Sequence, residues 1–242
     1  MDLSPETRLD TLIERDLTLG DAPGILWTPA LADSPTPLIL LGHPGDIGRM
    51  RPRLEARARA AAAQGFASVT LELPGTGARA RIVALDEARA ELRAAVLAGE
   101  RPTEDVVDRL ILPLVDQAAA EWRALVDALL ELPGIGGPVA VSGGIVSLGV
   151  RLAATDPRIV AASLFAGSWV PAAILEEART VTVPAHVLLQ WDDEGNDRQQ
   201  ALDLFDALGS TEKTLQANLG GHTGVPSFAG DDAARFLARH LT

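Results

Sequence analysis

The chain has 242 residues, of which 47% are hydrophobic and 22% charged, a composition typical of a globular protein long enough to bury a sizeable core. It has 33 acidic and 21 basic residues, a formal net charge of −12, which disfavours nucleic acid and anionic membrane lipid as partners. The absence of cysteine excludes disulfides, thiolate metal sites and a cysteine nucleophile.

The N-terminal residues, MDLSPETRLDTLIERD, are charged and polar, unlike a secretory signal or an arginine-rich transit sequence. No apolar stretch reaches the length of about 18 residues that a membrane span needs. We therefore expect a cytoplasmic protein that does not enter a membrane.

Apolar runs alternate with helical patterns along the chain, which indicates a mainly parallel sheet flanked by helices. Near the N-terminus, TLIERDLTL and GILWTPA predict two antiparallel edge strands. PLILLG (37–42) predicts a strand buried on both faces, followed by a helix at 51–64 and a strand at 66–73.

Residues 85–132 are helical in pattern almost throughout, with Thr103 as an N-cap and with breaks predicted at 99–102 and near Pro113. Strands and helices then alternate. The predicted strands are 138–142, 158–167, 183–191 and 213–219, and the predicted helices are 143–154, 170–179, 199–209 and 231–241. Neither a repeat nor a low-complexity linker interrupts the sequence, so residues 1–242 are expected to form a single domain.

Functional side chains of parallel α/β sheets gather in loops at the carboxyl ends of the strands. Four such loops hold nearly all the candidate residues, and in chain order they supply a glycine-rich segment, a hydroxyl, a carboxylate and an imidazole. They are Gly42-His43-Pro44-Gly45, Ser142-Gly143-Gly144, Asp192-Asp193-Glu194 and Gly220-Gly221-His222.

This order resembles the α/β-hydrolase superfamily, and within it the compact single-domain esterases and dienelactone-hydrolase-like proteins. The similarity extends over essentially the whole chain and rests on LILLGHPG, LELPGTG, AVSGG with LAATDPRI, VLLQWDDE, and ANLGGHTGVPSF before the helix ending in ARHL. It implies an α/β-hydrolase fold with a central, mainly parallel sheet of about eight strands flanked by helices. The helical insertion at about 85–132 would be a cap over the active site, or would simply pack on the sheet.

The resemblance also implies a Ser-His-Asp triad of Ser142, His222 and Asp193. His222 would be the general base and Asp193 would hold its tautomer, with the adjacent Asp192 as an alternative acid. Dienelactone hydrolases proper use a cysteine nucleophile, so covalent catalysis by this chain would have to use serine.

The nucleophile position stays open between alternatives. The family turn has the pattern G-x-S-x-G, whereas Ser142 lies in AVSGG, with Ala140 at the first glycine. Counting back from ATDPRI without gaps puts Gly143 at that position, and counting forward from GGPV puts Ile145 there. Ser142 would otherwise be a helix-capping residue, which would leave the protein without a nucleophile.

An oxyanion hole would use the backbone N–H groups of Gly143 and of the loop after strand 37–42. Pro44 has no N–H, so the second donor would be Gly45 or Asp46. The candidate pocket residues, by position, are Pro44, Asp46, Trp169 and Trp191. His43 matches a residue that is commonly structural in the family and is given no catalytic role.

The sequence therefore predicts a serine hydrolase, of carboxylesterase or lactonase type, acting on a small to medium ester or a related apolar small molecule, as a monomer or homodimer. No group of His, Asp and Glu has metal-ligand spacing, and neither a phosphate loop nor a dinucleotide fingerprint occurs, so no metal or cofactor is expected. The alternative is a nucleophile-deficient protein of the same fold, whose His222–Asp193 dyad catalyses an elimination or cyclisation, or whose pocket only binds a ligand.

Overall fold

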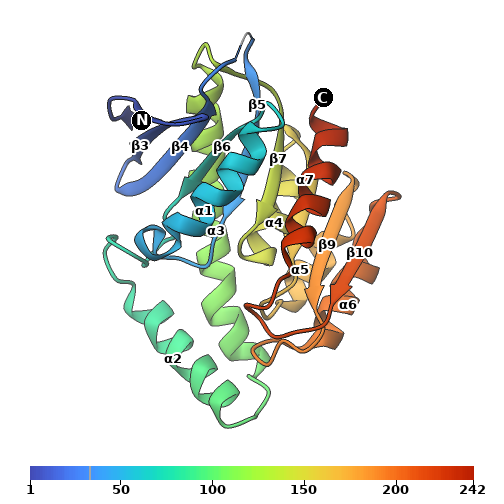
Figure 1. Ribbon diagram of the computed structural model, residues 1–242. Coiled ribbons are helices and arrows are strands. Elements are labelled where there is room, and N and C mark those ends of the chain that lie inside the picture. The colour runs from blue at the N-terminus through green and yellow to red at the C-terminus, as the bar shows by residue number, and fades with distance from the viewer. Residues whose placement is uncertain (33) are drawn as a thin grey trace.

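The computed structural model describes residues 1–32 and 34–242, which form a ten-stranded sheet with helices on both faces (Figure 1). Across the sheet the strand order is β1-β3-β4-β6-β5-β7-β8-β9-β10, and β2 pairs with β3 outside that path. The strands are β1 Asp2–Leu3, β2 Thr7–Leu9, β3 Leu12–Leu19, β4 Ala22–Pro29, β5 Thr36–Gly42, β6 Ala67–Leu71, β7 Ile135–Gly143, β8 Ile159–Phe165, β9 Ala185–Gln190 and β10 Lys213–Asn218. The helices are α1 Ile47–Ala62, α2 Val83–Leu97, α3 Glu104–Leu130, α4 Val146–Thr155, α5 Ala172–Ala178, α6 Arg198–Ala207 and α7 Ser227–Leu241.

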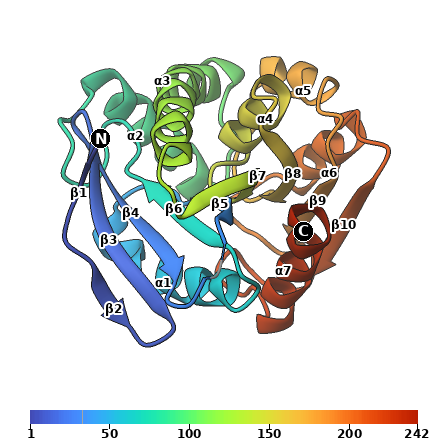
Figure 2. The ribbon, with the colours of Figure 1, turned by 90° about the horizontal axis from the view of Figure 1, so that it is seen from above.

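The sheet is parallel from β6 to β10 and antiparallel from β1 to β6, which confirms the mainly parallel architecture predicted from the sequence. The short strands β1 and β2 extend the antiparallel edge beyond the two strands expected there. Figure 2 shows α1 and α7 on one face of the sheet and α3, α4, α5 and α6 on the other.

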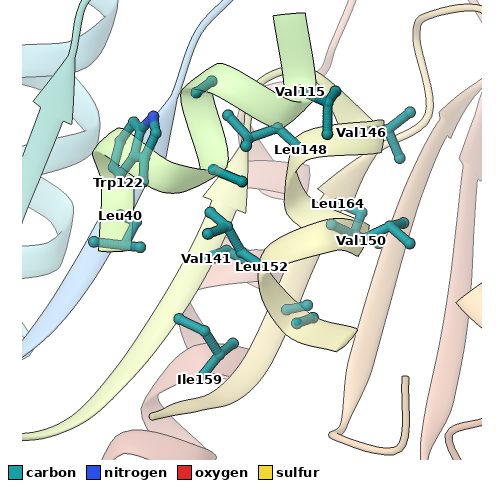
Figure 3. Close-up of a cluster of buried hydrophobic side chains, with 14 of the residues drawn as sticks. Leu40, Val115, Trp122, Val141, Val146, Leu148, Val150, Leu152, Ile159 and Leu164 are labelled. Atoms are coloured by element: carbon teal, nitrogen blue, oxygen red, sulfur yellow. The ribbon is translucent and has the colours of Figure 1, made fainter. Parts of the chain in front are cut away.

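The core lies on both faces of the central strands, because successive side chains of a strand point to opposite sides. Leu40 and Val141 belong to the cluster beneath α3 and α4, which Figure 3 shows, whereas Leu41 and Ala140 belong to the cluster beneath α1 and α7. Trp122 of α3 is 2% exposed and fills the first cluster above Leu40. Burial of this kind on both faces explains why these strands read as continuous apolar runs.

Several predicted boundaries differ from the structure. Helix α1 begins at Ile47 rather than at 51, because Asp46 caps it by accepting from the Arg49 N–H at 3.1 Å. Helix α7 begins at Ser227 rather than at 231. The break predicted near Pro113 was wrong: α3 continues through this proline, held by a buried stripe on either side of it that includes Leu110 and Leu114.

Helix α2 and the first turns of α3 project beyond the carboxyl edge of the sheet, as a cap would (Figure 1). Thr103 caps α3 as predicted, its hydroxyl accepting from the Val106 N–H at 3.4 Å. The second half of α3 instead packs on the sheet, where Leu125 and Leu129 are fully buried. The first part of the insertion therefore extends past the edge of the sheet, and its second part packs on the sheet.

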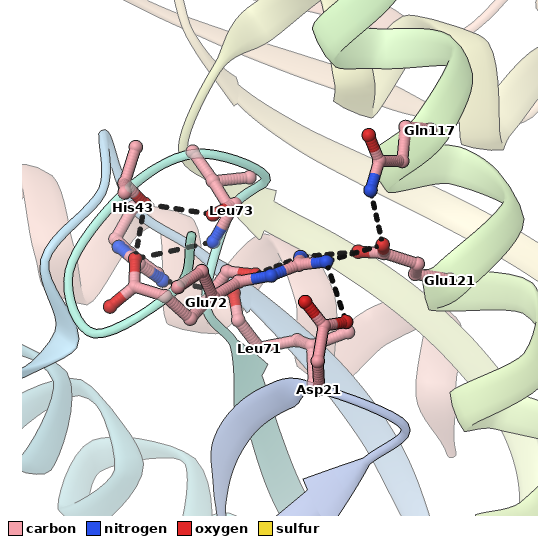
Figure 4. Close-up of polar contacts among 9 residues, drawn as sticks. Asp21, His43, Leu71, Glu72, Leu73, Gln117 and Glu121 are labelled. Atoms are coloured by element: carbon pink, nitrogen blue, oxygen red, sulfur yellow. Dashed lines mark hydrogen bonds and ion pairs between the residues drawn. The ribbon is translucent and has the colours of Figure 1, made fainter. Parts of the chain in front are cut away.

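A buried arginine, Arg79, ties α3 to the loop after β6; Figure 4 labels its partners Asp21, Glu72 and Glu121. The Arg79 side chain is 3% exposed and contacts Glu121 of α3 at 2.7 Å and Asp21 at 3.0 Å. It also donates to the Glu72 carbonyl at 3.1 Å. The hydrogen bonds with the Glu121 carboxylate raise the pKa of Arg79 above its ordinary value, so this cation is permanently charged.

We expect Arg79→Met to lower the free energy of unfolding by about 2 kcal/mol, because the partly buried Glu121 carboxylate, whose side chain is 21% exposed, would lose its charged hydrogen-bond partner. The free energy of unfolding of Arg79→Lys should lie between those of the wild type and Arg79→Met, since an ammonium cannot replace a bidentate guanidinium. Urea denaturation measures the change. The control is Arg81→Met, whose exposed side chain pairs with Asp86 and should leave the midpoint unchanged. Equal midpoints for the Arg79 variants and the wild type would contradict the expectation.

Candidate active site at the carboxyl edge of the sheet

A histidine and a carboxylate meet at the carboxyl edge of the sheet. His222, in the loop between β10 and α7, contacts Asp193, in the loop between β9 and α6, with an Nδ1–Oδ2 distance of 2.7 Å. The Asp193 side chain is 3% exposed, and that of His222 is 46% exposed. Phe165, at the end of β8, packs edge-on against the His222 ring with centroids 5.4 Å apart.

This contact sets the tautomer of the neutral ring. An ionised Asp193 accepts the proton of Nδ1, so the neutral imidazole carries its free lone pair on Nε2. Within residues 1–32 and 34–242, Nε2 has no hydrogen-bond partner. The second Asp193 oxygen accepts from the Gly195 N–H at 2.9 Å, which fixes the carboxylate. Such an arrangement can act as a general base with an orienting acid.

The loop that carries His222 is hydrogen-bonded to the end of β9. Gln190 is 1% exposed and donates from Nε2 to the Gly221 carbonyl at 3.1 Å. Asp192 accepts from the Gly220 N–H at 3.4 Å, so this carboxylate holds the loop backbone while Asp193 holds the imidazole. Sequence reasoning missed Gln190, although a polar residue at the end of the apolar strand VLLQW was a usable signal.

Gln190→Leu should free this loop, because no other described side chain donates to the Gly221 carbonyl. Loss of one neutral hydrogen bond of about 1 kcal/mol predicts roughly fivefold faster hydrogen exchange at the Gly224 amide, which bonds to the same carbonyl. Mass spectrometry or NMR measures the exchange. Gln199→Leu, on the exposed start of α6, is the matched control and should change nothing. Unchanged exchange in Gln190→Leu would rule out this anchoring role.

The turn between β7 and α4 is built from two glycines in the left-handed region, with φ of 68° at Gly143 and 79° at Gly144. A Cβ at Gly144 would lie 2.6 Å from Gly42 Cα and 3.0 Å from the His43 nitrogen. Backbone atoms cannot move aside as a flexible side chain can, so Gly144 has no room for a side chain. The turn where the family places its nucleophile therefore carries none at this position.

Ser142 lies within β7, one residue before this turn, rather than at the tip of it. It pairs with Leu41 and Ser163 on neighbouring strands and shares the face of the sheet that α1 covers. Its Oγ accepts a hydrogen bond from Arg57 Nη2 at 3.1 Å, and no hydrogen bond joins it to His222 in the described parts of the chain. Phe165, which packs on His222, is two residues beyond Ser163, roughly 7 Å further along the sheet.

Arg57 of α1 is the second feature that sequence reasoning missed. Its guanidinium donates to the Gly42 carbonyl at 2.9 Å and to the Ser142 carbonyl at 2.6 Å, which ties the ends of β5 and β7 together. Burial lowers the pKa of Arg57 to about 10, with a smaller contribution from Arg53. The available signal was its place on the buried face of α1, one turn from Leu54 and Ala61.

The loop after β5 was predicted to donate to an oxyanion, but its N–H groups already have partners. The Gly45 N–H donates to His43 Nδ1 at 3.0 Å. The Asp46 and Ile47 N–H groups donate to the buried Glu72 carboxylate at 2.8 and 2.7 Å. Gly143, the other predicted donor, pairs with Gly42 of β5. An oxyanion at this loop would have to displace an internal acceptor.

His43 is 2% exposed, and burial lowers its pKa below the ordinary 6.5. Because Nδ1 accepts from Gly45, the ring proton lies on Nε2, which contacts the Leu71 carbonyl at 3.0 Å. His186, also buried, contacts Ser163 at 3.3 Å and Gln216 at 3.2 Å, and burial lowers its pKa too. Both imidazoles are neutral parts of the core.

These lowered pKa values predict that stability falls below pH 6.5. In that range the unfolded chain binds protons on His43 and His186 while the folded chain does not, so acid favours unfolding. Each group contributes up to about 1.4 kcal/mol per pH unit until its folded pKa is reached. Urea denaturation between pH 7.5 and 5.5 measures the slope, which His186→Gln should reduce. An unchanged slope in that variant would contradict the assignment to His186.

An open cavity of about 280 Å³ lies between the cap and the loops after β8 and β9. Its lining residues are Val96, Gly99, Glu100, Arg101, Trp169, Glu194, Asn196 and Asp197. Trp169 thus lines a cavity next to the acid loop. Trp191 does not line it and instead stacks beneath the Arg198 guanidinium, 4.3 Å from the ring centroid. Pro44 and Asp46 are also absent from its lining.

Comparison with solved structures identifies the architecture. A cold-adapted esterase from an Arctic intertidal metagenomic library is 27% identical, with a TM-score of 0.77 and full coverage of both chains. The chain adopts the α/β-hydrolase fold. Two acetyl xylan esterases share this fold at lower identity. The enzyme of Thermoanaerobacterium sp. is 14% identical with a TM-score of 0.68, and the match covers 100% of this chain and 88% of the other. The enzyme of Paenibacillus sp. is 16% identical with a TM-score of 0.66, and the match covers 99% of this chain and 88% of the other. In sequence searches, no family model and no curated protein matches the chain.

None of the helices in the described part of the α/β-hydrolase chain combines the length and apolar character needed to cross a bilayer. Over residues 1–32 and 34–242, no three His, Asp or Glu side chains are grouped as a metal site requires.

Proposed function

We propose that the protein is a carboxylic ester hydrolase in which His222 is the general base and Asp193 orients it. The observation that carries the proposal is the 2.7 Å contact between these side chains, which leaves Nε2 open at the carboxyl edge. Similarity over its full length to an esterase, at 27% identity, supports ester hydrolysis as the reaction. The cap and the cavity beside the acid loop provide a place for a small substrate.

Two nucleophiles are available to this base. Ser142 would complete the Ser-His-Asp triad, but its hydroxyl would first have to leave Arg57 and turn away from the face that α1 covers. Water needs no rearrangement, because Nε2 is exposed and unpartnered among the described residues. The geometry therefore favours water as the nucleophile.

In this mechanism His222 Nε2 accepts a proton from water as the water oxygen attacks the ester carbonyl carbon. Asp193 stabilises the imidazolium that forms. The tetrahedral intermediate then breaks its bond to the alcohol oxygen, and the proton on Nε2 passes to that oxygen. The products are a carboxylic acid and an alcohol, and His222 returns to its neutral form.

A second candidate function keeps the dyad and omits hydrolysis. It is favoured by the N–H groups of Gly45 and Asp46, which serve His43 and Glu72 instead of a substrate oxyanion. Without such donors a tetrahedral intermediate loses its usual stabilisation. An elimination or cyclisation in which His222 abstracts a proton would not need oxyanion donors, and neither would ligand binding alone.

Three variants distinguish these possibilities with a short-chain p-nitrophenyl ester as substrate. His222→Gln should lower kcat/KM at least 100-fold, roughly the effect of losing a general base. Asp193→Asn should also lower it strongly, because the tautomer is no longer held. Ser142→Ala should retain activity within about tenfold, since the hydroxyl does not take part.

A fluorophosphonate probe followed by mass spectrometry tests the nucleophile directly. We expect no adduct on the peptide that contains Ser142. An adduct there, together with an inactive Ser142→Ala, would establish the serine triad and overturn the water mechanism. Absence of ester hydrolysis by the wild-type protein over a panel of acyl chain lengths would reject the hydrolase and leave the second candidate.

A further inference from the structure

The cavity of about 280 Å³ beside the acid loop is lined partly by residues of the loop that also carries Asp193 of the dyad. Glu194, which lines it, follows Asp193, and its Oε2 lies 2.7 Å from where a Cβ on Gly221 would be, next to His222. Asn196 also lines it and donates to the Ala166 carbonyl at 2.6 Å, one residue beyond Phe165. A ligand held here would lie beside the groups that surround the imidazole.

The cavity carries an excess of negative charge. Its lining includes the carboxylates Glu100, Glu194 and Asp197 and a single cation, Arg101, a balance of −2 from three negative and one positive group. Arg101 pairs with Asp197 at 2.8 Å. Neither Glu100 nor Glu194 has a cationic partner among the described residues. An anionic ligand would be repelled here, whereas a cation would be attracted.

The cavity lining includes one aromatic side chain, Trp169. Trp169 is 9% exposed, and its indole Nε1 makes no hydrogen bond with any residue at 1–32 or 34–242. The Arg101 guanidinium lies over its ring, 5.7 Å from the centroid. The protein's own cation thus already uses the two interactions that recognise organic cations, a carboxylate contact and an aromatic face.

We propose that this cavity binds the positively charged part of a ligand, and that the preferred ester substrates carry an ammonium group in the alcohol or acyl portion. The ammonium would lie near Trp169 and be neutralised by Glu100 and Glu194. The cavity volume is near the lower end of the range for small-molecule sites, about 300–1,000 Å³, and suits one compact head group. The substrate part of this proposal rests on the proposed ester hydrolase function, and the binding part does not.

Binding is tested first, without catalysis. The four tryptophans give four indole N–H signals in a ¹⁵N–¹H spectrum, and Trp169→Phe identifies the signal of Trp169. Tetramethylammonium should shift that signal in a saturable way, and tert-butanol, a neutral molecule of similar shape, should not. The double variant Glu100→Gln/Glu194→Gln should weaken the affinity at least fivefold.

The matched control is Glu87→Gln/Glu131→Gln, which changes the net charge equally at exposed positions outside the cavity and should leave the affinity unchanged. Absence of a shift with tetramethylammonium, or an equal shift with tert-butanol, would overturn the proposal. An equal loss of affinity in both double variants would also overturn it, because the effect would then come from net charge alone.

Turnover is tested with two esters of nearly the same shape, butyrylcholine and 3,3-dimethylbutyl butyrate. We expect kcat/KM at least tenfold higher for the cationic ester, and a ratio near one in Glu100→Gln/Glu194→Gln. Hydrolysis of both esters at equal rates would overturn the cation specificity and leave the hydrolase intact. A saturable tetramethylammonium shift without turnover of any ester would overturn the hydrolase and leave cation binding intact.

Discussion

The close approach of two glycines at the carboxyl ends of β5 and β7 determines what this active site can contain. Gly144 has so little space against Gly42 that a Cβ would lie 2.6 Å from its Cα. The adjacent strands pair Gly42 with Gly143, so β7 stays in the sheet up to Gly143 and the turn into α4 begins there. Because that turn is filled by backbone, Ser142 remains a strand residue, and the side chains that contact each other at this edge are His222 and Asp193.

The charges around the turn follow from this backbone packing. Two strand ends in close contact leave the carbonyls of Gly42 and Ser142 together, and Arg57 satisfies both. On the other side, the N–H groups that begin α1 need an acceptor, and Glu72 supplies a carboxylate to the positive end of that helix. A buried cation and a buried anion therefore each neutralise exposed backbone dipoles at this edge. A substrate group that approached these backbone groups would have to compete with Arg57 or Glu72 for them.

The fold was largely predictable because its central strands are buried on both faces and its loops hold distinct residue types. The apolar runs of β5, β7, β8 and β9 identified these strands, and the order of Asp193 before His222 identified the dyad. The end of β7 was predicted to within one residue, at 142 against Gly143, but its pairing with β5 up to Gly143 is a long-range contact that the sequence does not show. Arg57 was missed for a similar reason, because a charged residue in a helix is exposed in most proteins and only the tertiary structure shows what it binds.

The acid loop shows why composition alone does not describe electrostatics at a site. Its carboxylates are close in sequence but differ in partner: Asp193 orients an imidazole, Asp192 accepts from the Gly220 backbone, and Asp197 caps α6 and pairs with Arg101. Glu194 alone has no charged or hydrogen-bonded partner among the residues described, and it faces a cavity. The carboxylates of this loop therefore divide into groups that stabilise the loop and a remainder, Glu194, that acts on whatever enters the cavity. Only that remainder bears on ligand choice, because a carboxylate neutralised by a fixed partner exerts little field on a second cation.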